Sequence, residues 1–422
     1  MLQAICKFAT SMTQYANSKE VLFCFAFPEF HPLRLYATGI SKILITDSSN
    51  PFSKEKFNTL FNDNSWLVGW IGYGMKSHFE NFKTSTSDFF TPDMCWIEPQ
   101  VIFLAEDKVE SVIKGSIDDA QRIFRNIHQT SPHVQLKLHT HVKFLEYQEM
   151  FDRTMRAIRR GDIYEANLCI SFDFNSEIVN PYGVWKNTLS RMNAPFSSFV
   201  QWGDDFALCF SPERFIQKKA EQISSQPIKG TIASSAEPSE NEDLKNQLKN
   251  SFKDQTENRM VVDLIRNDLA RICIPGTVKV EELAILKSYP GIHHLVSTVA
   301  GELMDIGPDQ ILEATFPMAS MTGIPKHSMI SLMDEIEGKP RGIYSGSLGY
   351  KKPNGDFDLN VVIRTLLYNS DRGMARINAG GAITSQSNVN DEYEECIIKV
   401  RRLIQSLDPT FDLTLFSREK IS

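Results

Sequence analysis

Glu257 stands at a position where a carboxylate is costly. It belongs to the segment Ser251–Cys273, whose apolar residues have helical spacing. Successive residues of a helix advance by about 100°, which places Val261 and Leu264 within about 40° of Glu257. The carboxylate therefore lies in the middle of an apolar face, where it is unfavourable if unpaired. Either a nearby arginine pairs with it, or it is a metal ligand or a catalytic acid.

Two further glutamates lie on the predicted helix Asn390–Leu407. Glu392, Glu395 and Lys399 are spaced i, i+3 and i+7, so they fall within an arc of about 60° beside the apolar side. Glu395 and Lys399 alone would form a routine surface ion pair worth about 0.3–0.5 kcal/mol. The alternative is that these glutamates, like Glu257, serve a metal ion or a reacting group.

A lysine on a constrained turn is the third candidate. The segment Pro227–Thr231 reads PIKGT, so Lys229 lies between a proline and a glycine. If the side chain is buried, its ammonium loses charge readily, and the free amine can act as a nucleophile. These five residues in isolation favour the alternative of an ordinary loop lysine.

Predicted strands and helices must bring these residues together. Strands are expected where aromatic and β-branched residues concentrate: Glu20–Pro28, Trp66–Tyr73, Ile163–Phe174, Ser198–Phe210, Gly342–Tyr350 and Met374–Ile383. Helices are expected at helical apolar spacing: Tyr147–Arg160, Ser251–Cys273, Lys326–Glu337 and Asn390–Leu407. The acidic run Ala233–Glu242 is predicted to be a loop, and the polar stretch Ser131–Thr140 is a candidate boundary. The pattern favours a mixed α/β architecture.

Composition excludes several classes of protein. The chain has 422 residues, 42% of them hydrophobic and 23% charged, which is ordinary for a globular enzyme. Its net charge of −7 argues against a nucleic-acid partner. We expect no membrane span, because no apolar run approaches about 18 residues, and no signal peptide in Met1–Asn17. Seven scattered cysteines without a CxxC spacing predict a reducing, cytoplasmic location.

Ten segments occur in one order and together resemble the chorismate-utilising enzymes. That family comprises anthranilate synthase component I, aminodeoxychorismate synthase component I, and the isochorismate and salicylate synthases. The matching segments are GDIYEANL (161–168), SPERF (211–215), PIKGT (227–231), ENRMVVDLIRNDLAR (257–271), HLVST (294–298), PMASMTGIPK (317–326), RGIYSGSLGY (341–350), VVIRTL (361–366), AGGAI (379–383) and EYEECIIKV (392–400).

The resemblance implies an α/β (α+β) fold with two facing antiparallel β-sheets wrapped by helices and the site in a central cleft. Residues 1–140 would form an N-terminal subdomain, and residues 141–410 would form the chorismate-binding catalytic domain. The first of these parts resembles the family only loosely, through GWIGY (69–73). We expect the two parts to form one closely packed body.

Position 229 distinguishes branches of the family. Anthranilate synthases have alanine in this motif, whereas aminodeoxychorismate synthases have the lysine found here. The resemblance implies that Lys229 attacks C2 of chorismate as the C4 hydroxyl leaves, after which ammonia adds at C4 and expels the lysine. Such covalent catalysis divides one difficult displacement into two easier ones. The product would be 4-amino-4-deoxychorismate, a precursor of 4-aminobenzoate and folate.

The resemblance also implies roles for the acidic residues. Glu257, Glu392 and Glu395 would hold Mg²⁺, which uses a few carboxylates together with substrate and water oxygens. Glu213 would be the general acid that protonates the leaving hydroxyl, a task that requires a raised pKa. His294 would lie beside the reacting ring as a catalytic residue, although a lone histidine is as often structural.

Further matching positions imply contacts with the substrate. Arg364, Tyr344 and Lys399 would hold the enolpyruvyl carboxylate, for which an arginine offers a two-pronged contact. Glycines at 380 and 381 would allow backbone N–H groups to approach an oxygen closely. The remaining substrate-binding positions implied by the family are Thr322, Gly323 and Glu165.

Glu165 departs from the family pattern. Aminating relatives commonly have glutamine there, and water-adding relatives have a lysine that serves as the base. The absence of that lysine argues against an isochorismate or salicylate product, and a glutamate there would position ammonia. Ala319 in place of the usual glycine, and AGGAI in place of AGAGI, leave the detailed backbone contacts open.

Two rival functions are disfavoured by the sequence, and a glutaminase activity is not expected from it. Anthranilate synthase component I is disfavoured by Lys229, and a non-catalytic chorismate-binding subunit is disfavoured because every acid, nucleophile and metal position is present. The chain lacks a cysteine in a GxCxG setting, so we expect ammonia from a separate glutamine amidotransferase subunit. It also lacks the Leu-Leu-Glu-Ser signature of an amino-acid feedback pocket.

Overall fold

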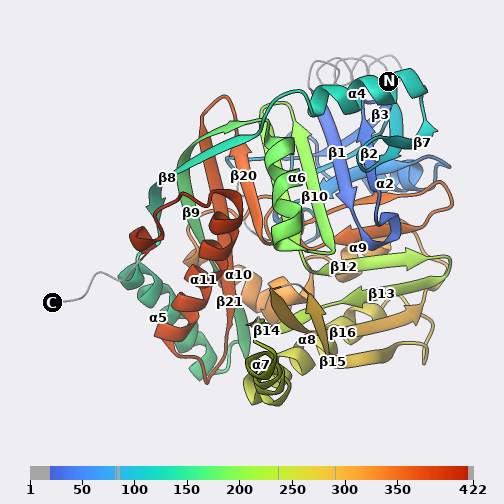
Figure 1. Ribbon diagram of the computed structural model, residues 1–422. Coiled ribbons are helices and arrows are strands. Elements are labelled where there is room, and N and C mark those ends of the chain that lie inside the picture. Colours follow the sequence, from blue (N-terminus) through green and yellow to red (C-terminus); the bar gives the residue numbers. More distant parts are fainter. Residues whose placement is uncertain (1–19, 81, 83–85, 236, 290, 417–422) are drawn as a thin grey trace.

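Two antiparallel sheets form the centre of the molecule (Figure 1). The computed structural model describes residues 20–416 except 81, 83–85, 236 and 290. The first sheet has eleven strands, in the order β17 (Gly323–Ile324), β9 (Glu165–Val179), β21 (Met374–Ile383), β20 (Thr365–Asn369), β11 (Asp205–Ser211), β10 (Phe196–Trp202), β1 (Val21–Ala26), β2 (Arg34–Thr38), β6 (Val101–Ala105) and β7 (Val109–Lys114), and β8 (His133–His141) also pairs with β9.

The second sheet has ten strands and packs against the first. Their order is β14 (Ile228–Ala233), β16 (Ile292–Glu302), β13 (Gln222–Gln226), β12 (Arg214–Lys219), β19 (Phe357–Asn360), β18 (Ser347–Lys351), β4 (Leu67–Ile71), β5 (Met94–Glu98) and β3 (Lys42–Thr46), and β15 (Lys279–Tyr289) also pairs with β16.

Helices cover the outer faces of both sheets. In the described residues they are α2 (Lys54–Phe61), α3 (Lys76–Phe79), α4 (Ile117–Ile127), α5 (Phe144–Arg160), α6 (Pro181–Met192), α7 (Pro238–Asn250), α8 (Phe252–Ala270), α9 (Pro308–Thr315), α10 (Lys326–Ile336) and α11 (Val389–Leu407). Helices α4, α5, α6, α10 and α11 share a core with the first sheet, and α2, α8 and α9 share one with the second. A third core lies between the sheets.

Strand β1 shows why the first sheet is buried on both faces. Successive side chains of a strand point to opposite faces. Leu22 and Cys24 accordingly join the core under the helices, whereas Phe23 and Phe25 join the core between the sheets. A strand placed in this way requires an unbroken apolar run, as in VLFCFA. The predicted α/β fold of two facing sheets wrapped by helices is confirmed.

Most predicted elements are confirmed with ends shifted by a few residues. Helices α5, α8, α10 and α11 and strands β1, β4, β9 and β21 lie where the sequence predicts them. Helix α5 ends at Gly161, whose φ of 82° only glycine adopts readily. The run Ser198–Phe210 forms the two strands β10 and β11, which pair with each other and turn at Gly203.

Two local predictions are wrong. The expected loop Ala233–Glu242 ends at Pro238, which begins helix α7 because proline suits a first helical position. The first half of Gly342–Tyr350 is a turn, with positive φ at Gly342 and Ser345, and the strand begins only at Ser347. Strands β15 and β16 were not predicted at all.

The stretch predicted as a boundary, Ser131–Thr140, mostly forms strand β8, which pairs with β9 over much of its length. Segments before residue 140 supply strands to both sheets, including β1 in the first and β4 in the second. The division at residue 140 stays a prediction. The segment Met1–Asn17, in which we expect no signal peptide, lies outside the described residues, as does Cys6.

Candidate active site

A cavity of about 570 Å³ opens between the two sheets. Its wall combines β14 and β16 of the second sheet with β21 of the first and helices α8 and α11. The predicted site residues that line it are Glu213, Lys229, Glu257, His294, Tyr344, Arg364, Gly380, Gly381, Glu395 and Lys399. These residues are far apart in sequence, so the fold brings them together at one place, the expected central cleft.

Lys229 reaches the cavity because its strand is irregular. Pairing of β14 with β16 slips by one residue between Ile228 and Thr231. Within this bulge Gly230 has a φ of 92°, a conformation that residues other than glycine avoid. A Cβ at Gly230 would also lie 2.9 Å from the Cβ of Asp254 on α8. The PIKGT sequence therefore turns the lysine out of the ladder and toward the cavity.

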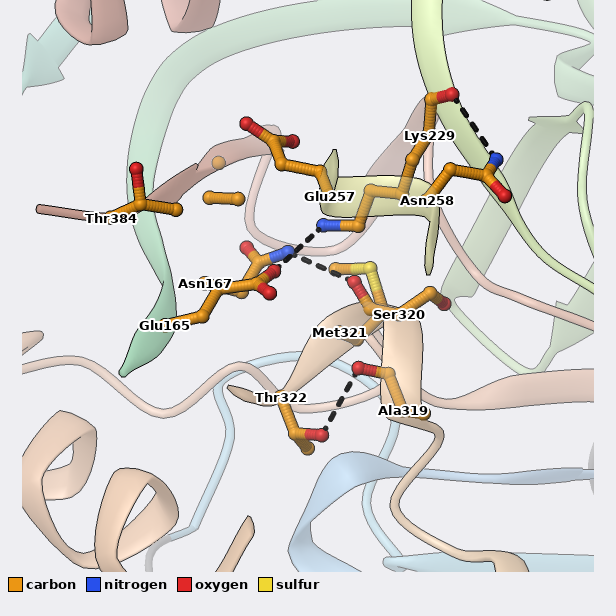
Figure 2. Close-up of polar contacts among 12 residues, drawn as sticks. Glu165, Asn167, Lys229, Glu257, Asn258, Ala319, Ser320, Met321, Thr322 and Thr384 are labelled. Atoms are coloured by element: carbon orange, nitrogen blue, oxygen red, sulfur yellow. Dashed lines mark hydrogen bonds and ion pairs between the residues drawn. The ribbon is translucent and has the colours of Figure 1, made fainter. Parts of the chain in front are cut away.

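Lys229 forms a buried ion pair with Glu165 at the start of β9. Its Nζ lies 3.3 Å from Glu165 Oε1, and the two side chains are 10% and 3% exposed (Figure 2). Burial favours the neutral amine, but Glu165, Glu257 and Glu213 favour the ammonium and raise the pKa of Lys229 above its usual value. The expectation that burial removes its charge is wrong, since the nearby carboxylates outweigh the loss of solvent.

Glu213 lies in the short link between β11 and β12 and is buried. Its backbone N–H donates to Ser211 Oγ at 3.2 Å, and its carbonyl accepts from the N–H of Val361 at 3.0 Å. Burial raises the pKa of Glu213 to about 7, against the opposing effects of Ser320 and Lys229. A carboxyl that keeps its proton near neutral pH is suited to general acid catalysis.

Three carboxylates gather where α8 and α11 approach each other. Glu257 and Glu392 are buried, and each has one oxygen without a hydrogen-bond partner, Oε1 and Oε2 respectively. Glu395 lies beside them, because a Cβ at Gly381 would be 3.3 Å from Glu392 Oε2 and 3.7 Å from Glu395 Oε1. Burial raises the pKa of Glu257 to about 7, whereas Lys399 lowers the pKa of Glu395 to about 2.

These carboxylates fit a magnesium ion. Within the described part of the chain, no three His, Cys, Asp or Glu side chains form a ready metal cage. Magnesium does not need one, since it binds through one or two carboxylates and completes its shell with water and substrate oxygens. The two orphaned, buried oxygens of Glu257 and Glu392 are the donors that such an ion would satisfy.

The cavity wall also carries basic residues. Arg364, with a φ of 53°, lines it together with Tyr344 and Lys399. Lys399 Nζ donates to the carbonyl of Gly380 at 2.7 Å. Burial and then Arg402 lower the pKa of Arg364 to about 10, so the guanidinium keeps its charge at neutral pH. This arrangement can hold a carboxylate.

His294 is neutral and oriented by its neighbour across the strand pair. Its Nδ1 lies 2.8 Å from Thr231 Oγ1, the residue paired with it in the ladder. Burial, and then Arg364, lower the pKa of His294 to about 3. The imidazole is therefore uncharged at neutral pH, and its ring nitrogens can donate or accept a hydrogen bond.

Thr322 and Gly323 do not line the cavity. The hydroxyl of Thr322 donates to the carbonyls of Met318 and Ala319, both at 3.2 Å, so the side chain turns back on its own loop (Figure 2). Gly323 pairs with β9, where a Cβ would lie 2.1 Å from the carbonyl oxygen of Glu165. Both residues shape the loop that carries Ser320, and their contact with the substrate stays a prediction.

Residues of the cavity wall that sequence reasoning did not assign to the site include Asn167, Lys253, Ser320 and Arg402. Only Lys253 had a signal. It precedes Glu257 by four residues, one helical turn, and so shares its face. The others depend on long-range contacts such as the hydrogen bond from Asn167 Nδ2 to the carbonyl of Ser320, at 3.1 Å.

A buried arginine fixes the wall behind Asn167. Arg341 Nη1 donates to the carbonyl of Met321, and Nη2 donates to the carbonyl of Asn167, both at 2.8 Å. The same guanidinium makes a two-pronged pair with Glu337, at 2.6 and 2.8 Å. Arg341 and Glu337 are almost fully buried, so their charges depend on each other.

We expect Arg341→Met to lower the free energy of unfolding by about 3–5 kcal/mol, because Glu337 would keep a buried charge without its partner. Urea denaturation measures the loss. Arg266→Met is the matched control, since Arg266 pairs with Asp263 at 2.9 Å but both side chains are exposed; its effect should stay within about 0.5 kcal/mol. A loss below about 1 kcal/mol for Arg341→Met would contradict the structural role.

Comparison with known proteins agrees with the fold. A model of the chorismate binding enzyme family matches residues 31–405. The chain therefore belongs to the chorismate binding enzyme family, as the ten sequence segments predict. Among the described residues, none of the helices combines the length and apolar character needed to cross a membrane.

Two relatives carry more specific names. The chain is 44% identical over 253 residues to "Aminodeoxychorismate synthase, chloroplastic" of Arabidopsis thaliana. The aligned region covers 58% of this chain and 27% of that protein. It is 34% identical over 352 residues to "Aminodeoxychorismate synthase component 1" of Salmonella typhimurium. This aligned region covers 81% of this chain and 76% of that protein. The chain thus spans about a quarter of the plant protein and about three-quarters of the bacterial one.

Solved structures of the same fold are more distant in sequence. Anthranilate synthase component I from Streptococcus pneumoniae superposes with a TM-score of 0.75 at 22% identity, covering 89% of this chain and 92% of the other. The menaquinone-specific isochorismate synthase of Escherichia coli superposes with a TM-score of 0.72 at 16% identity. The superposition covers 94% of this chain and 91% of the other. At such identities these likenesses establish the fold alone.

Proposed function

We propose that this chain is an aminating enzyme that converts chorismate and ammonia into 4-amino-4-deoxychorismate. The observation that carries the proposal is Lys229, a buried lysine directed into the family's cavity beside a protonatable Glu213. The two relatives named aminodeoxychorismate synthase support the same activity. The product would feed the synthesis of 4-aminobenzoate and folate.

The reaction would proceed through two displacements. The amine of Lys229 bonds to C2 of the ring while the bond between C4 and its oxygen breaks, and Glu213 gives its proton so that the hydroxyl leaves as water. Ammonia then bonds to C4, and the bond between C2 and the lysine nitrogen breaks, which restores the original positions of the double bonds. Each step is easier than a direct exchange at C4.

Glu165 would serve the nucleophiles of both steps. Lys229 must lose a proton before it can attack, and Glu165 Oε1, at 3.3 Å, is the acceptor within reach of its Nζ. The other oxygen of Glu165 is buried without a hydrogen-bond partner. A buried acceptor is costly to leave unsatisfied, so that oxygen is suited to hold incoming ammonia.

Substrate binding would divide between basic and acidic residues of the site. Arg364, with Tyr344 and Lys399, would hold the enolpyruvyl carboxylate. Glu257, Glu392 and Glu395 would hold Mg²⁺. When bound, the ion would neutralise the ring carboxylate, which the glutamates would otherwise repel.

A separate subunit would supply the ammonia. The bacterial relative is named "component 1", which supports a second component. All the described cysteines are buried, so none of them is placed to act on free glutamine. We therefore propose a glutamine amidotransferase partner, and a reducing, cytoplasmic setting in which the described cysteines remain free thiols.

Product identification tests the proposed function. Purified protein would be mixed with chorismate, Mg²⁺ and ammonium chloride, and the products analysed by mass spectrometry. We expect 4-amino-4-deoxychorismate with ammonium and no turnover with glutamine alone. Anthranilate with pyruvate would assign the chain to the anthranilate synthase branch, and isochorismate would overturn the aminating role. Chorismate binding without turnover at any ammonium concentration would favour a binding subunit.

A further inference from the structure

Lys253 spans the gap between the two helices that carry the acidic residues. It lies in the first turn of α8, and its Nζ is 2.8 Å from Glu392 Oε1 on α11 and 3.9 Å from Glu257 Oε1. The lysine side chain is 45% exposed, whereas those of Glu257 and Glu392 are 10% and 1% exposed. The ammonium therefore covers two buried carboxylates from the solvent side.

The cavity contains two other ion-paired lysines, and they are held differently. Lys229 is almost fully buried against Glu165. Lys399 is anchored twice, by Glu395 at 2.5 Å and by the carbonyl of Gly380. Of these three lysines Lys253 has the most exposed side chain, at 45% against 10% and 26%. It can withdraw into water at little cost in solvation.

The contact of Lys253 leaves its partners incompletely satisfied. Glu257 Oε1 and Glu392 Oε2 have no hydrogen-bond partner although both are buried. Buried carboxylate oxygens of this kind are costly unless they are paired with a cation or hydrogen-bonded. A divalent cation would contact such oxygens directly and carries twice the charge of an ammonium.

We infer that Lys253 is a positioning residue that holds Glu257 and Glu392 together before a divalent cation binds, and that the cation displaces it. The inference rests on the proposed magnesium site. A magnesium ion lies about 2.0–2.1 Å from its oxygen ligands, so it cannot share the same carboxylates with an ammonium without strong repulsion. The affinity for the ion would then include the cost of removing the lysine.

Direct measurement of Mg²⁺ binding tests the inference without turnover. We expect Lys253→Met to bind Mg²⁺ about tenfold more tightly than the natural protein by isothermal titration calorimetry, a change equivalent to about 1.4 kcal/mol. The metal-free variant should also melt at a lower temperature, because two buried carboxylates lose their counter-ion. On addition of Mg²⁺, its melting temperature should rise more than that of the natural protein.

Lys339→Met is the matched control. Lys339 pairs with Asp173 at 2.7 Å, and the side chains are 47% and 5% exposed, nearly as for Lys253 and Glu392. It lines another, smaller pocket, so its loss should leave Mg²⁺ affinity unchanged. Lys253→Arg keeps the positive charge and should bind Mg²⁺ no more tightly than the natural protein. Lys253→Gln replaces the methionine variant if that variant does not fold.

Several results would overturn the inference. Unchanged or weaker Mg²⁺ binding by Lys253→Met would show that the lysine does not compete with the ion. Equal tightening in Lys253→Arg would show that its charge is not the cause. If the natural protein binds no Mg²⁺, the magnesium site fails together with the inference, whereas the product analysis still decides the aminating function.

Discussion

Lys229→Ala is expected to lower kcat for the ammonium-dependent reaction by roughly 10³-fold or more. The variant lacks the amine that pairs with Glu165 at 3.3 Å, so the two-step route is closed. The measurement is the rate of product formation by mass spectrometry at saturating chorismate. Chorismate affinity should change little, because Arg364 and Lys399 in the cavity wall are untouched.

Lys326→Ala serves as the control for loss of an ion-paired lysine. Lys326 Nζ lies 2.7 Å from Asp268 Oδ2 on the neighbouring helix α8, and Lys326 is not part of the cavity wall. Its replacement should leave kcat within about twofold of the natural value. If Lys229→Ala keeps most of the activity, ammonia displaces the hydroxyl directly and the covalent route is wrong.

Glu213→Gln is expected to lower kcat by about 10²–10⁴-fold, the usual contribution of a general acid. Glutamine preserves the shape of the side chain but has no acidic proton to give to the leaving hydroxyl. Glu221→Gln, in the exposed turn that follows β12, is the control and should leave kcat unchanged. A loss below about tenfold for Glu213→Gln would assign the proton transfer to another group.

The pKa of Glu213 also predicts how the rate depends on pH. The acid must be protonated to act, and its pKa is about 7. At a constant concentration of free ammonia, the rate that depends on Glu213 should therefore fall as the pH rises through about 7. The Glu213→Gln variant should be slow throughout and should lack this fall. An unchanged alkaline decline in the variant would contradict the assignment.

The same group links pH to stability. The folded-state pKa of Glu213, about 7, lies above the usual value of 4.5 for a glutamate. A raised pKa means that the protonated form stabilises the folded protein, and this contribution is complete below about 4.5. It is lost as the pH rises toward and through about 7. Glu213→Gln should remove this part of the dependence, which urea denaturation at several pH values measures.

The sequence by itself determined the family, the fold class and most of the helices that carry the site. Helix α8 places Glu257 on an apolar face, and α11 places Glu392 and Glu395 one turn apart. Such relations depend only on the helical period, so they can be read locally. The PIKGT motif likewise specifies the bulge of β14, because its glycine is the residue that tolerates the required φ.

Only the tertiary structure decided which groups meet and what charge they carry. Lys229 is buried rather than placed on a solvated loop, yet carboxylates from three other segments raise its pKa. Lys253 lies on the same helical face as Glu257, but its closer contact is with Glu392, 139 residues away in sequence. Strands β15 and β16 and the partners of Arg341 also depend on distant segments. The physical reason is that burial and charge pairing depend on distances in space, which local sequence patterns do not contain.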